Sequence, residues 1–161
     1  MEIRPATVAD AEALCAIYNP FVRTTTITFE EASVSPAEMT RRIREVQAWG
    51  PWLVGQEDEA VIGYAYATPW RTRSAYRFSA ETTVYVAPQH GRKGVGKGLY
   101  LRLLADLKTQ GIHAVMGGIA LPNAASVALH EALGFQKVAH FSQVGRKFDT
   151  WVDVGYWQLL L

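Results

Sequence analysis

The sequence predicts a single domain of mixed α/β (α+β) fold, with helices on both faces of a mixed, mostly antiparallel central sheet. Three observations support this prediction. The 161 residues suit one domain, and no linker or internal repeat divides residues 1–161. Apolar residues recur at helical spacing in some segments and form alternating or β-branched runs in others. Along the chain, these segments give the order β-α-α-β-β-β-α-β-α-β-β.

The first part of the chain predicts one strand and two helices. Ile3 lies in a short strand, and the pattern T-x-x-D from Thr7 to Asp10 resembles a helix-capping signal. Because the residue before proline disfavours α geometry, Asn19-Pro20 predicts a kink or the end of this helix. The segment Thr24–Phe29 is either an irregular loop over a pocket or a short strand. A capping box with proline at the first helical position, Ser35–Glu38, begins the second helix.

The second helix is followed by a hairpin and then by the most informative stretch, Glu81–Leu107. The hairpin strands are Trp52–Val54 and Val61–Ala67. In the informative stretch, β-branched and aromatic residues from Thr82 to Val86 form a strand, and leucines at every fourth position after Val95 predict a helix. The turn between them combines glycines with basic residues, namely Gly91, Arg92, Lys93, Gly94, Gly96, Lys97 and Gly98.

This turn predicts an anion site, because glycine permits close backbone approach and free N–H groups at a helix N-terminus favour negative charge. Two familiar phosphate motifs nevertheless fail here. Gly91–Lys97 fits the spacing of a P-loop, but the next residue, Gly98, lacks the hydroxyl that would hold the metal ion. A dinucleotide motif beginning at Gly94 would need a third glycine at the position of Leu99.

The C-terminal part predicts three strands and one helix. His113–Ile119 forms a strand, and Asn123 is a natural N-cap for a helix that reaches Leu133. The last two strands are Phe135–Phe141 and Trp151–Leu160. The apolar character of the final strand suits either a contact in a homodimer or an interior strand.

Composition excludes several classes of function. The 16 basic and 15 acidic residues nearly balance, so no overall field attracts nucleic acid or a membrane surface, and no apolar run approaches the length of a membrane span. The single cysteine, Cys15, forms no internal disulfide and is expected in the core. With no apolar signal segment near the N-terminus, these features predict a cytoplasmic protein. No histidine has metal-ligand partners at suitable spacing, so no metal is expected.

The turn resembles motif A of the GNAT superfamily of N-acetyltransferases, whose pattern is Gln/Arg-x-x-Gly-x-Gly/Ala. Gly94 and Gly96 match its glycines, whereas Gly91 stands where the family carries Gln or Arg. A second family signature is an asparagine followed by an aromatic residue or histidine four residues before Gly-Phe, matched by Asn123, His130 and Gly134-Phe135. The element order also resembles the GNAT fold over nearly the whole chain.

More narrowly, five separated segments resemble the phosphinothricin N-acetyltransferases, which include enzymes acting on methionine sulfoximine and methionine sulfone. These segments are Ala16–Asn19, Trp70–Tyr76, Ala80–Val86, Leu121–Gly134 and Val144–Leu159. The resemblance implies acetyl-CoA as co-substrate, a small amino acid analogue as acceptor, and a homodimer. It places the pantetheine along the central strand and the pyrophosphate at the turn, with these cofactor-binding residues: Val84, Tyr85, Val86, Arg92, Lys93, Gly94, Val95, Gly96, Lys97 and Asn123.

Acetyl transfer to an amine requires a base for the ammonium proton and a proton for the departing thiolate. Glu81, at the entrance of the central strand, is the candidate base; the alternative is a strand-edge carboxylate in a salt bridge. His130 stands where many GNAT enzymes carry a tyrosine, and it either donates the proton or positions water or substrate. The resemblance implies that the acceptor meets Arg71 and Arg73, which suit its carboxylate, and the walls Phe29 and Tyr76.

The predicted function is therefore acetylation of the α-amino group of phosphinothricin, methionine sulfoximine, methionine sulfone or a similar amino acid. A second hypothesis keeps the fold but changes the acceptor to a protein N-terminus, a polyamine or an aminoglycoside. A third is a non-catalytic acyl-CoA-binding module, against which the presence of both Glu81 and His130 argues.

Overall fold

A computed structural model describes all of residues 1–161 and contains one seven-stranded sheet with the strand order β1-β2-β3-β4-β5-β7-β6. The strands are β1 (Glu2–Pro5), β2 (Trp52–Glu57), β3 (Ala60–Pro69), β4 (Ser79–Val86), β5 (Ala114–Leu121), β6 (Gln136–Lys147) and β7 (Thr150–Leu160). The helices are α1 (Ala11–Thr24), α2 (Pro36–Gln47), α3 (Val95–Gln110) and α4 (Ala124–Ala132), with short 3-10 turns at Val8–Asp10, Ser74–Tyr76 and Pro88–His90. The predicted fold class and order of elements are confirmed.

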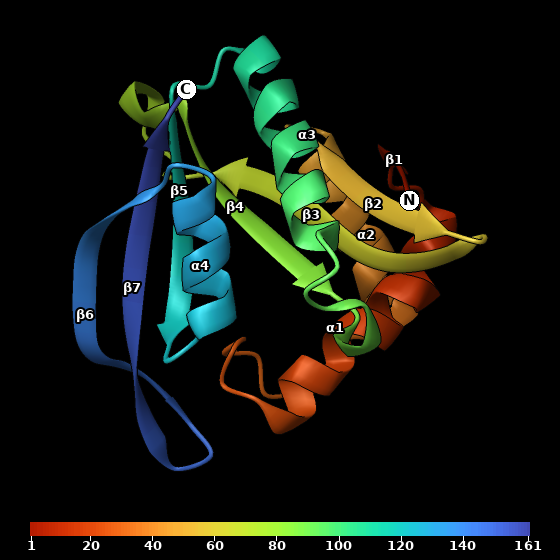
Figure 1. Cartoon of the computed structure of the whole chain (residues 1–161), viewed down its shortest axis with the longest axis horizontal. Helices are drawn as coiled ribbons and strands as arrows, with labels where there is room; N and C mark the ends of the chain where they lie inside the picture. Colours follow the sequence, from red (N-terminus) through yellow and green to blue (C-terminus); the bar gives the residue numbers. More distant parts are fainter.

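The sheet is antiparallel except at its centre, where β4 and β5 run parallel. Their pairing covers only Ser79–Glu81 against Ala114–Met116. Beyond the pair Glu81 and Met116 the two strands diverge, as Figure 1 shows. We call this point of divergence the fork. It leaves one edge of each strand free in the middle of the molecule.

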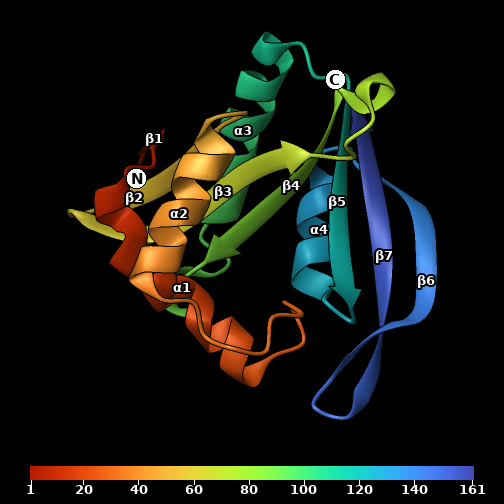
Figure 2. The ribbon, with the colours of Figure 1, turned by 180° about the vertical axis from the view of Figure 1, so that it is seen from behind.

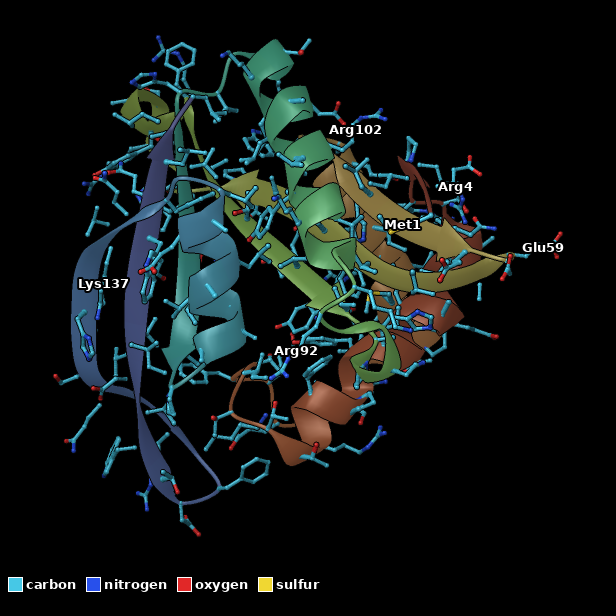
Figure 3. All side chains as sticks on the ribbon, viewed as in Figure 1. Met1, Arg4, Glu59, Arg92, Arg102 and Lys137 are labelled. Atoms are coloured by element: carbon cyan, nitrogen blue, oxygen red, sulfur yellow. The ribbon has the colours of Figure 1, made fainter.

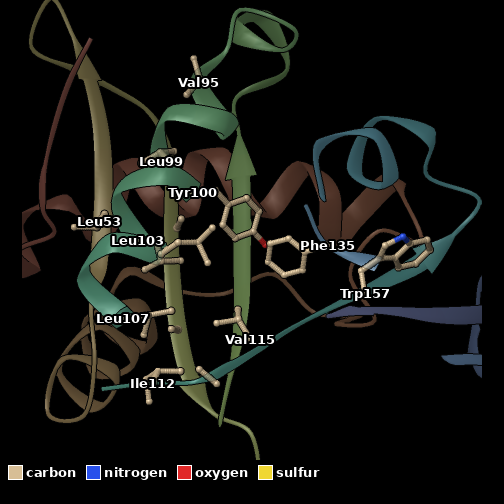
Figure 4. Packing of buried hydrophobic residues seen from close by; sticks show 14 of the residues in the cluster. Leu53, Val95, Leu99, Tyr100, Leu103, Leu107, Ile112, Val115, Phe135 and Trp157 are labelled. Carbon is tan, nitrogen blue, oxygen red and sulfur yellow. The ribbon is translucent and has the colours of Figure 1, made fainter. Parts of the chain in front are cut away.

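Helices α3 and α4 cover one face of the sheet, and α1 and α2 cover the other (Figures 1 and 2). Two apolar cores result. The core beneath α3 contains Leu99, Leu103 and Leu107, the residues at every fourth position that predicted this helix (Figure 4). The second core joins α1 and α2 to the opposite face and includes Cys15, which is buried as expected.

Most predicted helix ends are confirmed. The Ser35 side chain accepts the Glu38 N–H at 3.1 Å, and the Asn123 side chain accepts the Ser126 N–H at 3.2 Å. Of the two outcomes predicted at Asn19-Pro20, a helix end is wrong, because α1 continues through Pro20 to Thr24. Buried Val22 anchors this last turn, while the Asn19 side chain bonds both backbone groups of Val34. The following residues, up to Ser35, form a loop and not a strand.

The C-terminal hairpin differs from the prediction in the length of its first strand. Strand β6 continues to Lys147, past an irregularity in its pairing with β7 between Phe141 and Gly145. Strand β7 lies inside the sheet, between β5 and β6. Trp157 is accordingly buried and donates to Glu131 Oε1 at 3.3 Å, so it faces the core and not a partner, whereas Trp151 is exposed.

Candidate active site

The main cleft, of about 740 Å³, lies at the fork. Its walls come from β4, the glycine-rich turn, the N-terminal turns of α3, β5 and α4. Of the predicted cofactor-binding residues, Lys93 does not line this cleft; those that do are Val84, Tyr85, Val86, Arg92, Gly94, Val95, Gly96, Lys97 and Asn123. Segments that are separated in sequence therefore meet where one elongated ligand would contact all of them.

The mouth of the cleft suits an anion. Gly94 is the N-cap of α3 and has φ of 82°, a left-handed conformation that glycine adopts without strain. The free N–H groups of the first turn of α3 lie beside Arg92 and Lys97. Figure 3 labels Arg92 in the turn between β4 and α3. A helix N-terminus with adjoining cations favours phosphate groups.

Glu81 stands at the fork, opposite Met116 in the last pair of the parallel ladder. Burial raises the pKa of its carboxyl group, and the positive charge of Arg71 opposes part of this effect. Its Oε1 atom lies 3.3 Å from the position that a Cβ atom on Gly118 would take. A half-buried carboxylate with a raised pKa at a free strand edge is suited to accept a proton.

His130 projects from α4 into the cleft and is only 3% exposed. Its Nδ1 lies 2.7 Å from the Ser126 carbonyl oxygen, and its Nε2 lies 3.1 Å from the Tyr100 hydroxyl. Since a carbonyl only accepts, we assign the proton to Nδ1, which leaves Nε2 to accept from Tyr100 in the neutral ring. Burial lowers the pKa of His130, although the bond to Ser126 works in the opposite direction.

Glu81 and His130 lie on opposite faces of β5. The His130 ring occupies the space that a side chain on Gly117 would need, while Glu81 lies over the next residue, Gly118. Because successive residues of a strand point to opposite faces of its sheet, the two candidate catalytic groups approach the fork from opposite sides. A reacting centre at the fork therefore has a carboxylate on one side and an imidazole on the other.

The predicted acceptor residues are only partly brought together. Arg71 lies near enough to influence Glu81, and its guanidinium stacks on the ring of Trp70 at 4.0 Å. Arg73 and Tyr76 are exposed in the turn before β4. Phe29 is 41% exposed and packs against Gly145 of β6. None of the four predicted acceptor residues, Phe29, Arg71, Arg73 and Tyr76, lines the main cleft.

Sequence reasoning missed four residues at the fork: Tyr100, Gly117, Gly118 and Tyr156. Tyr100 and Gly118 line the cleft, and the ring of Tyr156 lies 3.1 Å from the Cβ position of Gly118. The consecutive glycines in M-G-G-I were the available signal, because glycine inside a strand often marks close approach of another group. Tyr156 gave no signal, since aromatic residues are ordinary in strands.

No group of three or more histidine, cysteine, aspartate or glutamate side chains is arranged to hold a metal ion. None of the helices is both long enough and apolar enough to cross a membrane.

Comparison with known proteins places this architecture in a family. Residues 3–155 match the acetyltransferase (GNAT) domain. A phosphinothricin N-acetyltransferase from Streptomyces viridochromogenes is 43% identical over 98% of this chain and 86% of its own length. An L-methionine sulfoximine/L-methionine sulfone acetyltransferase from Salmonella typhimurium is 38% identical over 100% of this chain and 95% of its own.

The solved structures agree. The crystal structure of a GNAT superfamily phosphinothricin acetyltransferase from Sinorhizobium meliloti, in complex with AcCoA, superposes with a TM-score of 0.96. It is 34% identical to this protein, and the match covers 99% of this chain and 88% of the other.

Proposed function

Because this chain belongs to the GNAT family and is an N-acetyltransferase with acetyl-CoA as donor, we propose that its acceptor is the α-amino group of a small amino acid analogue. Phosphinothricin, methionine sulfoximine and methionine sulfone are the favoured acceptors, as the names of the relatives suggest. The observation that carries the proposal is the fork, where a carboxylate with a raised pKa adjoins the anion-favouring cleft.

The cleft fits acetyl-CoA on the chemistry of its lining. The free edge of β4 near Val84 and Val86 offers backbone groups to the pantetheine amides, and the first turn of α3 offers N–H groups to the pyrophosphate. Arg92 and Lys97 add positive charge beside these N–H groups. Acetyl-CoA supplies the activated acetyl group; the protein supplies orientation and proton transfer.

Glu81 serves as the base in this proposal and accepts the ammonium proton of the acceptor directly or through water. The free amine then forms the N–C bond as the C–S bond of the thioester breaks, and the second proton lost by the nitrogen passes to the departing thiolate, directly or through water. His130 has two candidate roles. Donating a proton to the thiolate requires the imidazolium, which burial disfavours, so the neutral ring bonded to Ser126 and Tyr100 better supports a positioning role.

The acceptor carboxylate is assigned to Arg71 and Arg73, because a guanidinium holds a carboxylate through two parallel hydrogen bonds. Phe29 and Tyr76, which lie outside the main cleft, would meet the acceptor from the loops around it. Arg71 supports this assignment through its position near Glu81. Arginines at the acceptor site would suit an anionic amino acid better than a polyamine or an aminoglycoside, which would need carboxylates.

We also propose a homodimer in the cytoplasm. Apolar side chains are exposed on the C-terminal hairpin, namely Phe141, Val144, Phe148 and Trp151, and they would be covered by a second copy. The single free cysteine suits a reducing compartment. Sedimentation of the purified protein as a monomer would contradict the dimer, and cell fractionation tests the compartment.

A panel of acceptors tests the proposed function. The protein is incubated with acetyl-CoA and each amine, and the release of free thiol is followed. We expect turnover of methionine sulfone and phosphinothricin, and none of spermidine or an aminoglycoside. Turnover restricted to a polyamine or a peptide N-terminus would overturn the acceptor class. Tight binding of acetyl-CoA without turnover of any amine would indicate a binding module.

A further inference from the structure

Gly118 occupies an unusual place in β5. It is the only exposed residue in that strand, and its neighbours Gly117 and Ile119 are buried. On one side it pairs with Tyr156 of β7. On the other side β4 has already diverged, because the parallel ladder ends at Met116. The exposed backbone of Gly118 is therefore a gap in the cover of the sheet, located at the fork.

Gly118 is also where the two halves of the site meet. It lines the cofactor cleft, which Glu81 and Tyr156 do not. A Cβ atom on Gly118 would lie 3.1 Å from the ring of Tyr156 and 3.3 Å from Glu81 Oε1. These distances are shorter than ordinary carbon contacts, so even a methyl group would crowd the space between the carboxylate and the aromatic ring.

We infer that Gly118 determines acceptor specificity by keeping open the passage between Glu81 and Tyr156, through which the amine reaches the thioester. This inference rests on the proposed function, in which the base and the acyl donor act at the fork. Gly118 lies between Glu81, which is outside the cleft, and the cleft that would hold the thioester, so an amine deprotonated by Glu81 would cross Gly118 to reach the acetyl group. The missing side chain leaves room for the α-carbon and its substituents.

Two neighbours give the passage its apolar wall. The ring of Tyr156 packs edge-on against Trp70, with centroids 5.4 Å apart, and against Phe141 at 6.0 Å. These contacts hold the Tyr156 ring over Gly118. Burial raises the pKa of the Tyr156 hydroxyl, and the charge of Glu81 adds to this effect, so the hydroxyl stays protonated next to the carboxylate. The wall of the passage formed by Tyr156 is therefore held in place. A larger residue at position 118 would narrow the passage, because this wall does not move away.

The test is the substitution Gly118→Ala, with Gly50→Ala as matched control. A Cβ atom on Gly50 meets its nearest neighbours at 3.6 Å and 3.7 Å, which are ordinary contacts, and Gly50 lies outside the cleft. For Gly118→Ala we expect kcat/KM for methionine sulfone to fall by about 10-fold or more, since one methyl group in a tight pocket has effects of this size. The loss should shrink for smaller primary amines. The Kd of acetyl-CoA, measured by calorimetry, should stay within about twofold of wild type, because the added methyl group would point toward Tyr156 and Glu81, which do not line the cofactor cleft.

An equal loss for all acceptors, no loss, or a parallel loss of acetyl-CoA affinity would overturn the inference. If Gly118→Ala does not fold, Tyr156→Leu tests the same passage from its other wall. That variant should improve bulky acceptors relative to small ones, and an unchanged ratio would contradict us. If the wild type acetylates another amine and no amino acid analogue, the proposed acceptor class is wrong. The kcat/KM of wild type and Gly118→Ala is then compared with that amine and with smaller and larger amines, and the role of Gly118 is still decided.

Discussion

Gly117 and Gly118 are neighbours in β5, but they open onto two different environments. The Gly117 side is closed: His130 fills the space of the missing side chain and is bonded at both ring nitrogens. The Gly118 side is open and exposed, and only the edges of Glu81 and Tyr156 approach it. The difference suggests that one face of the fork holds a fixed group, while the other must admit acceptors.

The packing around each glycine fits this division. The His130 ring packs edge-on against Tyr100 at 5.2 Å and against Phe135 at 5.1 Å. Figure 4 shows Tyr100 and Phe135 in the core beneath α3. Such a ring has little freedom to move, because interiors are close-packed. The Glu81 carboxylate makes no hydrogen bond to another side chain, and its environment acts on its pKa through burial and the charge of Arg71. A proton acceptor must stay free to meet its substrate, and this arrangement leaves it so.

The strongest test of the comparison is Glu81→Gln, which keeps the shape of the side chain and removes its basicity. If the open face carries the base, kcat at neutral pH should fall by about 100-fold or more. In the wild type, kcat should fall as pH drops through the pKa of Glu81, because only the carboxylate accepts the proton. Burial raises that pKa, so the acidic limb should lie above the range of an ordinary glutamate.

Glu45→Gln is the control for this change. Glu45 is exposed on α2, forms an ion pair with Arg41 of the same helix, and is far in sequence from the residues of the fork. Steady-state kinetics from pH 5 to 9 make the measurement. Near-normal kcat in Glu81→Gln, or an acidic limb that survives in it, would show that Glu81 is not the base.

A smaller effect is expected on the closed face, from Gly117→Ala. The new methyl group would collide with the His130 ring and force it out of its bonds to Ser126 and Tyr100. Overpacking of this kind costs about 1–3 kcal/mol of stability. Activity should fall about 10-fold if His130 has a catalytic or positioning role. A displacement of about 1 Å in a group that positions the reactants can lower the rate by as much as about 100-fold.

Thermal unfolding and kinetics of Gly117→Ala separate the two consequences. Gly50→Ala should keep its stability within about 0.5 kcal/mol, as expected for substitutions that meet no crowding. If Gly117→Ala loses stability but keeps full activity for every acceptor, His130 serves only the fold. The contrast with Gly118→Ala is then sharper, since that variant should lose activity in an acceptor-dependent way.

The sequence predicted the fold and the cofactor side more completely than the acceptor side, and the reason is physical. The cofactor cleft is built from local signals, such as the glycine turn before Val95 and the cap at Asn123, which act within a few residues. The acceptor side depends on long-range register. Tyr156 reaches Gly118 only because β7 pairs with β5, and no local pattern encodes that pairing.

The same limit explains the acceptor residues that the structure does not gather. Phe29 lies in a loop whose position depends on β6, because Lys147 is buried and its Nζ donates to the Thr28 carbonyl oxygen at 2.8 Å. Lys147 and Thr28 are 119 positions apart in the sequence. A contact of this separation follows from topology and cannot be inferred from spacing along one segment.

The mildest prediction concerns the charge that faces the open side. Arg71→Gln removes the guanidinium whose positive charge lowers the pKa of Glu81, so that pKa should rise and the acidic limb of kcat should move to higher pH. The acidic limb of kcat in Gly117→Ala should not move in this way, because that substitution displaces His130, which lies across the sheet from Arg71.

Salt provides a second test. Since Arg71 is exposed, salt screens its field, and the difference between the acidic limbs of wild type and Arg71→Gln should shrink as ionic strength rises toward about 1 M. Full pH profiles at low and high salt measure both effects. A limb that stays in place at low salt would mean that Arg71 does not act on Glu81, and its role would then be limited to the carboxylate of the acceptor, seen as a higher KM with an unchanged profile.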